Sequence, residues 1–174
     1  VRLPGGRALI YSVTSVHPIS PRVEDSTFAY DIATKRRTLL GMNMLPLSVS
    51  PQGDRLAFKR SSEDRTGIFL WTMPIDPKTG IATGQAQRVS LRPISRGGMF
   101  SPDGKMLAFN AGPRPDGTWD VILVPATGGS ERVVANYPDR GTLTWSADGK
   151  SLYVERGTDD PRIAAIERVP VAGG

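Results

Sequence analysis

The sequence contains no cysteine and a single histidine, His17, among its 174 residues. Without cysteine there are no disulfide bonds, thiolate metal sites or cysteine nucleophiles, and the redox compartment is left open. A structural zinc site needs several His or Cys ligands, so we expect no metal and no cofactor. Serine hydrolysis needs a histidine base, but His17 lies in a Pro-flanked stretch and no G-x-S-x-G elbow is present. We therefore expect that the chain is not itself an enzyme.

Long apolar runs and blocks of one charge are also missing. No run of eighteen apolar residues occurs, so no membrane insertion is expected, and the opening VRLPGGR lacks the apolar stretch of a secretory signal. The net charge is +5, but the basic residues are scattered and are not interleaved with aromatic residues that could stack on bases. Nucleic acid is therefore not an expected partner. Asp116, Asp159 and Asp160 are candidate calcium ligands, although Asp and Gly side by side usually indicate a turn.

Turn-forming residues, in contrast, are abundant. The chain has 19 Gly and 15 Pro, and 39% of its residues are hydrophobic. Pro and Gly recur at the ends of short apolar runs, a distribution that favours many short strands and little helix.

A nine-residue segment occurs four times. The clearest copy is Ser101 to Phe109 (SPDGKMLAF), and the others start at positions 3 (LPGGRALIY), 50 (SPQGDRLAF) and 146 (SADGKSLYV), about 45 to 50 residues apart. Pro and Gly favour a tight turn that Asp or Gln can cap, and the apolar residues that follow alternate as in a strand. The predicted structural turn residues are Pro51, Gly53, Pro102, Asp103, Gly104, Asp148 and Gly149.

Three further segments accompany each copy. Val121 to Gly129 matches Ile166 to Gly174, and looser versions lie at 28–34 and 69–76. Short segments at 37–40, 88–91 and 132–135 suit an outer strand, and those at 45–49, 98–100 and 142–145 suit an innermost strand. Each repeat thus predicts four antiparallel strands, and the period is that of a propeller blade.

The repeated Ser-Pro-Asp-Gly segment and the strands around it resemble the TolB-type, WD40-like β-propeller repeat, which also occurs in the propellers of prolyl-oligopeptidase-type peptidases. The fold class expected from this resemblance is an all-β propeller of about four blades, part of a larger propeller. We treat residues 1–174 as a single domain or fragment with repeats near 3–45, 46–95, 96–141 and 142–174. Four partial units leave open edges, so two chains could complete one ring as a homodimer.

The best functional prediction concerns the loops. In such a blade, the loops between the second and third strands and the connectors between blades share one face. Here they are expected at 12–27, 61–67, 92–97, 111–118 and 136–141. Long loops on a rigid scaffold are where binding residues gather. The predicted binding residues on this face are Arg22, Asp25, Arg65, Arg96, Arg114, Asp116 and Arg140.

Three functions remain open at this point. The first is a non-catalytic scaffold that binds another protein, a peptide or a small ligand. The second is the accessory propeller of a serine peptidase, and the third is the sensor domain of a regulator or kinase. The resemblance to TolB-type proteins implies a periplasmic or extracellular location.

Overall fold

A computed structural model describes residues 1–16, 23–64, 66–139, 141–157 and 164–172. Within these ranges the regular elements are all strands, and no helix is long and apolar enough to cross a membrane. In chain order the strands are β1 (Ala8–Val16), β2 (Val23–Asp31), β3 (Arg37–Met42), β4 (Met44–Val49), β5 (Arg55–Ser61), β6 (Ile68–Pro74), β7 (Gln87–Arg88), β8 (Ile94–Phe100), β9 (Met106–Ala111), β10 (Trp119–Pro125), β11 (Arg132–Tyr137), β12 (Leu143–Trp145), β13 (Ser151–Gly157) and β14 (Ala164–Pro170).

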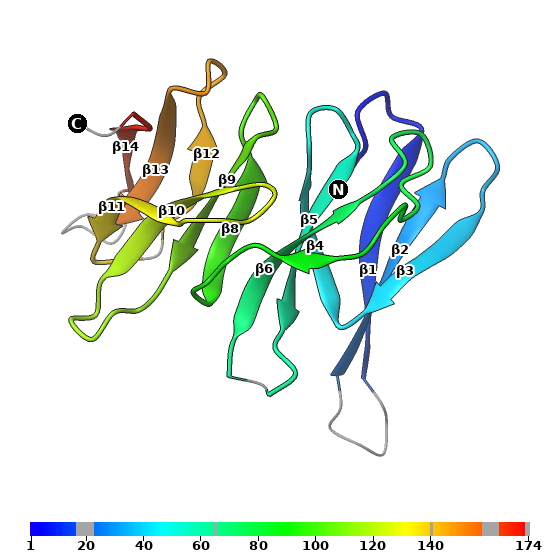
Figure 1. Ribbon diagram of the computed structural model, residues 1–174, viewed down its shortest axis with the longest axis horizontal. Helices are drawn as coiled ribbons and strands as arrows, with labels where there is room; N and C mark the ends of the chain where they lie inside the picture. Colours follow the sequence, from blue (N-terminus) through cyan, green and yellow to red (C-terminus); the bar gives the residue numbers. More distant parts are fainter. Residues whose placement is uncertain (17–22, 65, 140, 158–163, 173–174) are drawn as a thin grey trace.

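The strands form four antiparallel sheets in which each strand pairs with its neighbour in sequence. The sheets are β1-β2-β3, β4-β5-β6-β7, β8-β9-β10-β11 and β12-β13-β14. They stand side by side in chain order, from the blue first sheet to the orange and red last sheet (Figure 1). Strands β4, β8 and β12 lie along a common inner edge, with β8 in contact with both others. This arrangement is a β-propeller of about four blades, as the sequence predicts.

The strand bounds differ from the sequence expectation mainly where polar residues extend a strand. Strand β1 extends to Val16 and strand β2 begins at Val23, so Asp25 lies in a strand and not in a long loop. Strand β8 begins at Ile94, four residues earlier than expected, because its polar and Gly residues pair with β9. Arg96 is therefore also a strand residue. The outer strand β7, in contrast, is reduced to Gln87 and Arg88.

The Ser-Pro-Asp-Gly segments form tight turns held by the serine. The Ser101 hydroxyl donates to the Asp103 carboxylate at 2.5 Å and accepts the Met106 N–H at 3.0 Å, so it links both sides of the turn. The Lys105 N–H donates to the same carboxylate. The hydrogen bond from Ser101 and then that from Lys105 hold the pKa of Asp103 below its ordinary range. Gly104 has a φ of 75°, which L side chains rarely adopt.

The copy at Ser50 corrects one expectation. Gln52 does not cap its own turn; its amide donates to the Asp103 carbonyl of the next blade at 3.2 Å. The Ser50 hydroxyl instead donates to Asp54 at 2.7 Å, and the Arg55 N–H donates to the Ser50 oxygen. A carboxylate thus holds the serine here too, but it comes from a position two residues later in the segment.

Hydrophobic clusters between neighbouring sheets form the core. Leu56 and Phe58 of the second sheet pack with Ile10 of the first sheet. The equivalent Leu107 and Phe109 of the third sheet pack with residues of the second sheet, and a third cluster joins the third and fourth sheets. The second and third sheets therefore each use one face against the preceding sheet and the other against the following sheet.

Candidate binding face

The strand order sends the β5–β6 and β9–β10 loops and the connectors between sheets to the same side of the propeller, here named the loop face. The Ser-Pro-Asp-Gly turns lie at the opposite ends of the strands. Because β5 ends at Ser61 and β9 ends at Ala111, the loops at 62–67 and 112–118 lie where the sequence places them.

The structure separates the predicted binding residues into several places. Arg114 and Asp116 lie in the β9–β10 loop and belong to one polar network. Asp25 lies in β2, where its carboxylate accepts the Thr14 hydroxyl at 2.6 Å. Arg96 lies in β8 and donates to the Thr142 hydroxyl in the β11–β12 connector at 3.3 Å. Arg22, Arg65 and Arg140 lie outside the described residues, as do His17, Asp159 and Asp160.

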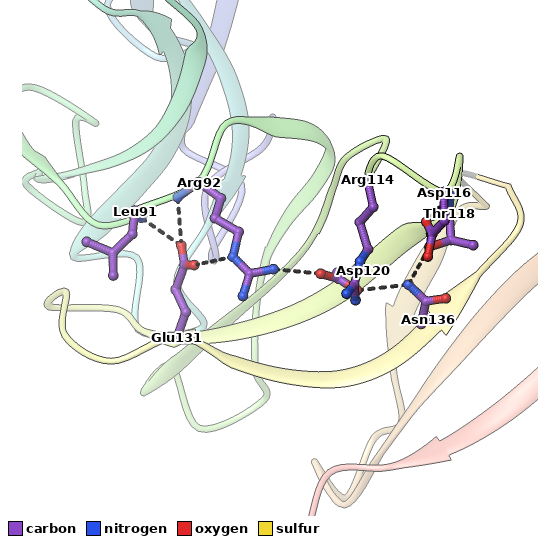
Figure 2. A network of polar contacts seen from close by, with 8 residues as sticks. All are labelled: Leu91, Arg92, Arg114, Asp116, Thr118, Asp120, Glu131 and Asn136. Atoms are coloured by element: carbon purple, nitrogen blue, oxygen red, sulfur yellow. Dashed lines mark hydrogen bonds and ion pairs between the residues drawn. The ribbon is translucent and has the colours of Figure 1, made fainter.

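The network of Arg114 and Asp116 is centred on Asp120, which is buried near the start of β10 (Figure 2). Its carboxylate side chain is 2% exposed and accepts Arg92 Nη1 at 2.6 Å and Arg114 Nη1 at 3.2 Å. Asn136 of β11 donates to the same carboxylate at 2.9 Å and also to the Thr118 hydroxyl. One buried carboxylate thus joins a connector, a loop and a strand.

Burial alone would raise the pKa of Asp120. The hydrogen bond from Asn136, the hydrogen bond and charge of Arg114, and the hydrogen bond from Arg92 outweigh that effect, so the pKa of Asp120 lies below its ordinary value. The carboxylate is therefore ionised at neutral pH.

Glu131, between β10 and β11, extends the network along the connector between β7 and β8. One carboxylate oxygen accepts the N–H groups of Leu91 and Arg92 at 2.7 and 3.2 Å, and the other lies 3.4 Å from Arg92 Nε. Figure 2 shows Arg92 between the carboxylates of Glu131 and Asp120. The network thus contains two cations, Arg92 and Arg114, and two buried anions, Asp120 and Glu131, so its net charge is zero. We call it the polar clamp, because it holds the connector and the β9–β10 loop in place.

Four residues of this network were not predicted from the sequence: Arg92, Asp120, Glu131 and Asn136. Asp120 has a detectable pattern, because it shares one side of β10 with Ile122 and Val124, which are core residues. A carboxylate on the core side of a strand predicts a charged partner. The partner Arg92 lies 28 residues away, and no local pattern identifies it.

A hollow of about 570 Å³ opens on the loop face beside the first and second sheets. Its charged lining residues are Asp25 of β2, Lys59 and Arg60 of β5, and Glu63 of the β5–β6 loop. The Arg60 guanidinium lies 5.6 Å from the centre of the Trp71 ring. The Lys59 ammonium and the Glu63 carboxylate form no ion pair or side-chain hydrogen bond with the described part of the chain. The hollow therefore offers charged groups of both signs to a ligand.

Among the described residues, no group of three or more His, Cys, Asp or Glu side chains could hold a metal ion.

The repeated serines all form hydrogen bonds within their own turns. At Ser146 the hydroxyl donates to Asp148 at 2.6 Å and accepts the Ser151 N–H at 3.0 Å.

No family model matches the sequence, and a comparison with curated proteins gives no significant match. Solved structures match over almost the whole chain. They include the β-propeller domain of the trilobed protease from Pyrococcus furiosus, with a TM-score of 0.69, 16% identity, and coverage of 97% of this chain and 52% of that one. TolB from Acinetobacter baumannii gives a TM-score of 0.64 at 15% identity, with coverage of 99% and 43%.

The acylaminoacyl peptidase of Pyrococcus horikoshii gives a TM-score of 0.70 at 18% identity, with coverage of 97% of this chain and 30% of that one. The chain thus spans between 30% and 52% of the length of these three proteins. At these identities the similarity concerns the fold. The chain has the fold of a TolB-type β-propeller, which peptidase propeller domains share.

Proposed function

We propose that this chain is a non-catalytic binding scaffold whose loop face recognises a protein, a peptide or a small ligand with charges of both signs. The observation that supports this proposal is the loop-face hollow, in which Lys59 and Glu63 have no charged partner among the described residues. Its volume of about 570 Å³ is within the range of ligand pockets, about 300–1,000 Å³. The loops stand on rigid sheets, an arrangement that suits recognition because little order has to be gained on binding.

The charges determine the ligand class. Lys59 is half-buried, and an ammonium group in such a place gains from an anionic partner. Glu63 and Asp25 offer anions in the same hollow, so a ligand with both a carboxylate and an amine is favoured. A peptide has both groups. The scattered basic residues support a partner other than nucleic acid, and the TolB-type fold supports a location outside the cytoplasm.

The absence of catalysis is part of the proposal. Ser50, Ser101 and Ser146 occupy the same structural place in three turns, and each donates its hydroxyl proton to a carboxylate. The pKa values of Asp103 and Asp148 lie below their ordinary range because each carboxylate accepts the serine hydroxyl and a backbone N–H. These carboxylates are therefore weak bases, which suits holding the turn and does not suit activating a serine nucleophile.

Selection of peptides from a random displayed library, followed by calorimetric titration of the best binders, tests the binding proposal. We expect Lys59→Glu to weaken binding by about tenfold or more, since it places like charge beside the ligand carboxylate. The matched control is Lys105→Glu, the same substitution in a turn on the opposite face, and it should leave the affinity unchanged. A library that yields no binders, or binders that do not respond to Lys59→Glu, would show that the hollow is not the recognition site.

A second candidate function is the accessory propeller of a serine peptidase. It is favoured by the fold shared with the trilobed protease domain and the acylaminoacyl peptidase. The gene sequence tests it: a G-x-S-x-G elbow with a downstream histidine in the same reading frame supports this function, and a frame without them contradicts it.

A further inference from the structure

The loop-face hollow lies at the junction of the first and second sheets, which stand side by side (Figure 1). Asp25, Thr27 and Ala29 alternate along β2, and the Thr27 hydroxyl donates to the Met44 carbonyl of β4 at 2.6 Å. The side of the first sheet that carries Asp25 therefore faces the second sheet. Because Asp25 also lines the hollow, the first sheet supplies an anionic wall.

The second sheet supplies cations on the other side of this junction. Arg60 lines the hollow and shares one side of β5 with Phe58, which packs with Ile10 of the first sheet. Arg60 and Asp25 thus extend into the same junction from facing sheets, yet no ion pair joins these two described residues. Lys59, the residue before Arg60, lines the same hollow. The space between the two walls is therefore open to a ligand that carries both charges.

Arg60 is prepared to bind a carboxylate. Its guanidinium lies 5.6 Å from the centre of the Trp71 ring, and that ring stacks on Phe58 with centres 6.5 Å apart. The aromatic ring attracts a cation at this distance and so restrains the guanidinium. The guanidinium forms no ion pair with the part of the chain that the structure describes, so its fork of N–H donors is available for two parallel hydrogen bonds to a carboxylate.

The size of the hollow limits the length of the ligand. A volume of about 570 Å³ is that of a sphere roughly 10 Å across, and an extended chain spans about 3.3–3.6 Å per residue. About three residues therefore fit, with their two ends near opposite walls. Between the charged groups, Leu45 and Ile68 offer apolar surface for a side chain, and the Ser61 hydroxyl can pair with a peptide group.

We propose that the loop-face hollow binds a short peptide with two free ends, about three residues long, with its amino group at Asp25 and its carboxylate at Arg60. This inference rests on the proposed function and narrows the ligand from peptides in general to free chain ends. Asp25 receives the amine because it is half-buried, whereas Glu63 lies in an exposed loop, where water weakens an ion pair. Lys59 adds positive charge on the carboxylate's side.

Calorimetric titration of the 174-residue chain with trialanine tests both contacts. Four forms of the peptide are compared: free, N-acetylated, C-terminally amidated, and blocked at both ends. We expect each single block to weaken binding by about tenfold or more, as for the loss of a hydrogen bond between charged groups. The form blocked at both ends should bind more weakly than either singly blocked form.

Two variants assign each end of the peptide to its partner. Asp25→Asn keeps an oxygen for the Thr14 hydroxyl, and it should bind free trialanine about tenfold more weakly and be insensitive to acetylation. Arg60→Gln should show the same loss and be insensitive to amidation. Arg36→Gln, at an exposed arginine between β2 and β3 on the opposite face, is the control and should bind like the unmodified chain.

The pairing of each block with one variant is the decisive result. Acetylation that weakens binding by Asp25→Asn as much as binding by the unmodified chain would overturn the assignment of the amine, and amidation tests Arg60→Gln in the same way. Circular dichroism checks that the variants fold. Arg60→Lys, which keeps the charge but loses the fork, replaces Arg60→Gln if that variant does not fold.

A peptide with its two charges on side chains, N-acetyl-Glu-Ala-Lys-amide, separates this inference from the proposed function. We expect it to bind at least tenfold more weakly than free trialanine, because its blocked ends offer no charge to either wall. If it binds in a manner that depends on Lys59 and free trialanine does not bind, the inference fails and the proposed function stands. If neither peptide binds and the displayed library yields no binders, both fail.

Discussion

Replacing Asp120 with Asn is the sharpest test of the polar clamp. The amide keeps one oxygen for Arg114 and Asn136 but presents an N–H₂ group to Arg92, whose Nη1 lies 2.6 Å from the carboxylate oxygen. Breaking a fully buried ion pair costs about 3–5 kcal/mol. Here the side chains of Arg92 and Arg114 are 45% and 50% exposed and can turn to water. We therefore expect the cost of one lost charge-assisted hydrogen bond, about 2 kcal/mol.

Equilibrium denaturation in urea measures this change in the free energy of unfolding, and the dependence of that free energy on urea concentration should have the same slope in both proteins. The pKa of Asp120 lies below its ordinary value of 3.8, so its carboxylate stabilises the fold at any pH above that value. This contribution is lost as the pH falls through the lower folded-state pKa. The difference between the unmodified chain and Asp120→Asn should thus be constant from neutral pH down to about 5 and shrink below 3.8. Asp116→Asn, in the exposed loop beside it, is the control and should cost less. A difference below about 0.5 kcal/mol at neutral pH, or one that grows in acid, would refute the clamp.

Four further substitutions test the turns, strands and core of the blades, and their effects on stability are measured in the same way. Gly149→Ala places a side chain at a φ of 69° with ordinary space around it, so it should cost about 1 kcal/mol. Gly97→Ala should cost more than Gly149→Ala, because the new Cβ would lie 2.9 Å from the Phe109 Cα; equal costs would contradict this close approach. Ser101→Ala leaves the Met106 N–H without its partner and should cost about 1–3 kcal/mol. Phe109→Ala removes a fully buried ring from a sheet junction and should cost about 3–5 kcal/mol; a cost below about 1 kcal/mol would contradict its place in the core.

The fold could be predicted because its strongest determinants are local. A turn such as Ser101 to Met106 is held by hydrogen bonds within six residues, so its chemistry is visible in one short segment and is repeated with the blade. Strand ends were less predictable. Arg96 and Asp25 extend strands β8 and β2 by pairing with a neighbouring strand, and that pairing depends on the sheet and not on the residue's own preference.

The site could be predicted only in part. The loop at 112–118, with Arg114 and Asp116, follows from the spacing of the two strands around it. The partners of these residues do not, because Arg92 and Asp120 approach each other only after two sheets have packed. Lys59 was also not identified, since an isolated lysine at the end of an apolar strand has no distinctive pattern until the hollow around it is known.

The two ways of holding the turn serine have a consequence for how such repeats diverge. Ser101 is bonded to the carboxylate two residues later, and Ser50 to the one four residues later. A repeat with acids at both positions could lose either without leaving its serine unpaired, so the change from SPDG to SPQG passes through no defective intermediate. When the residue two positions after the serine no longer has to hold the serine, it is free to contact the neighbouring blade, as Gln52 does with Asp103. Redundancy within one turn thus supplies new contacts between turns, and a search pattern that requires Asp in SPDG will miss intact blades.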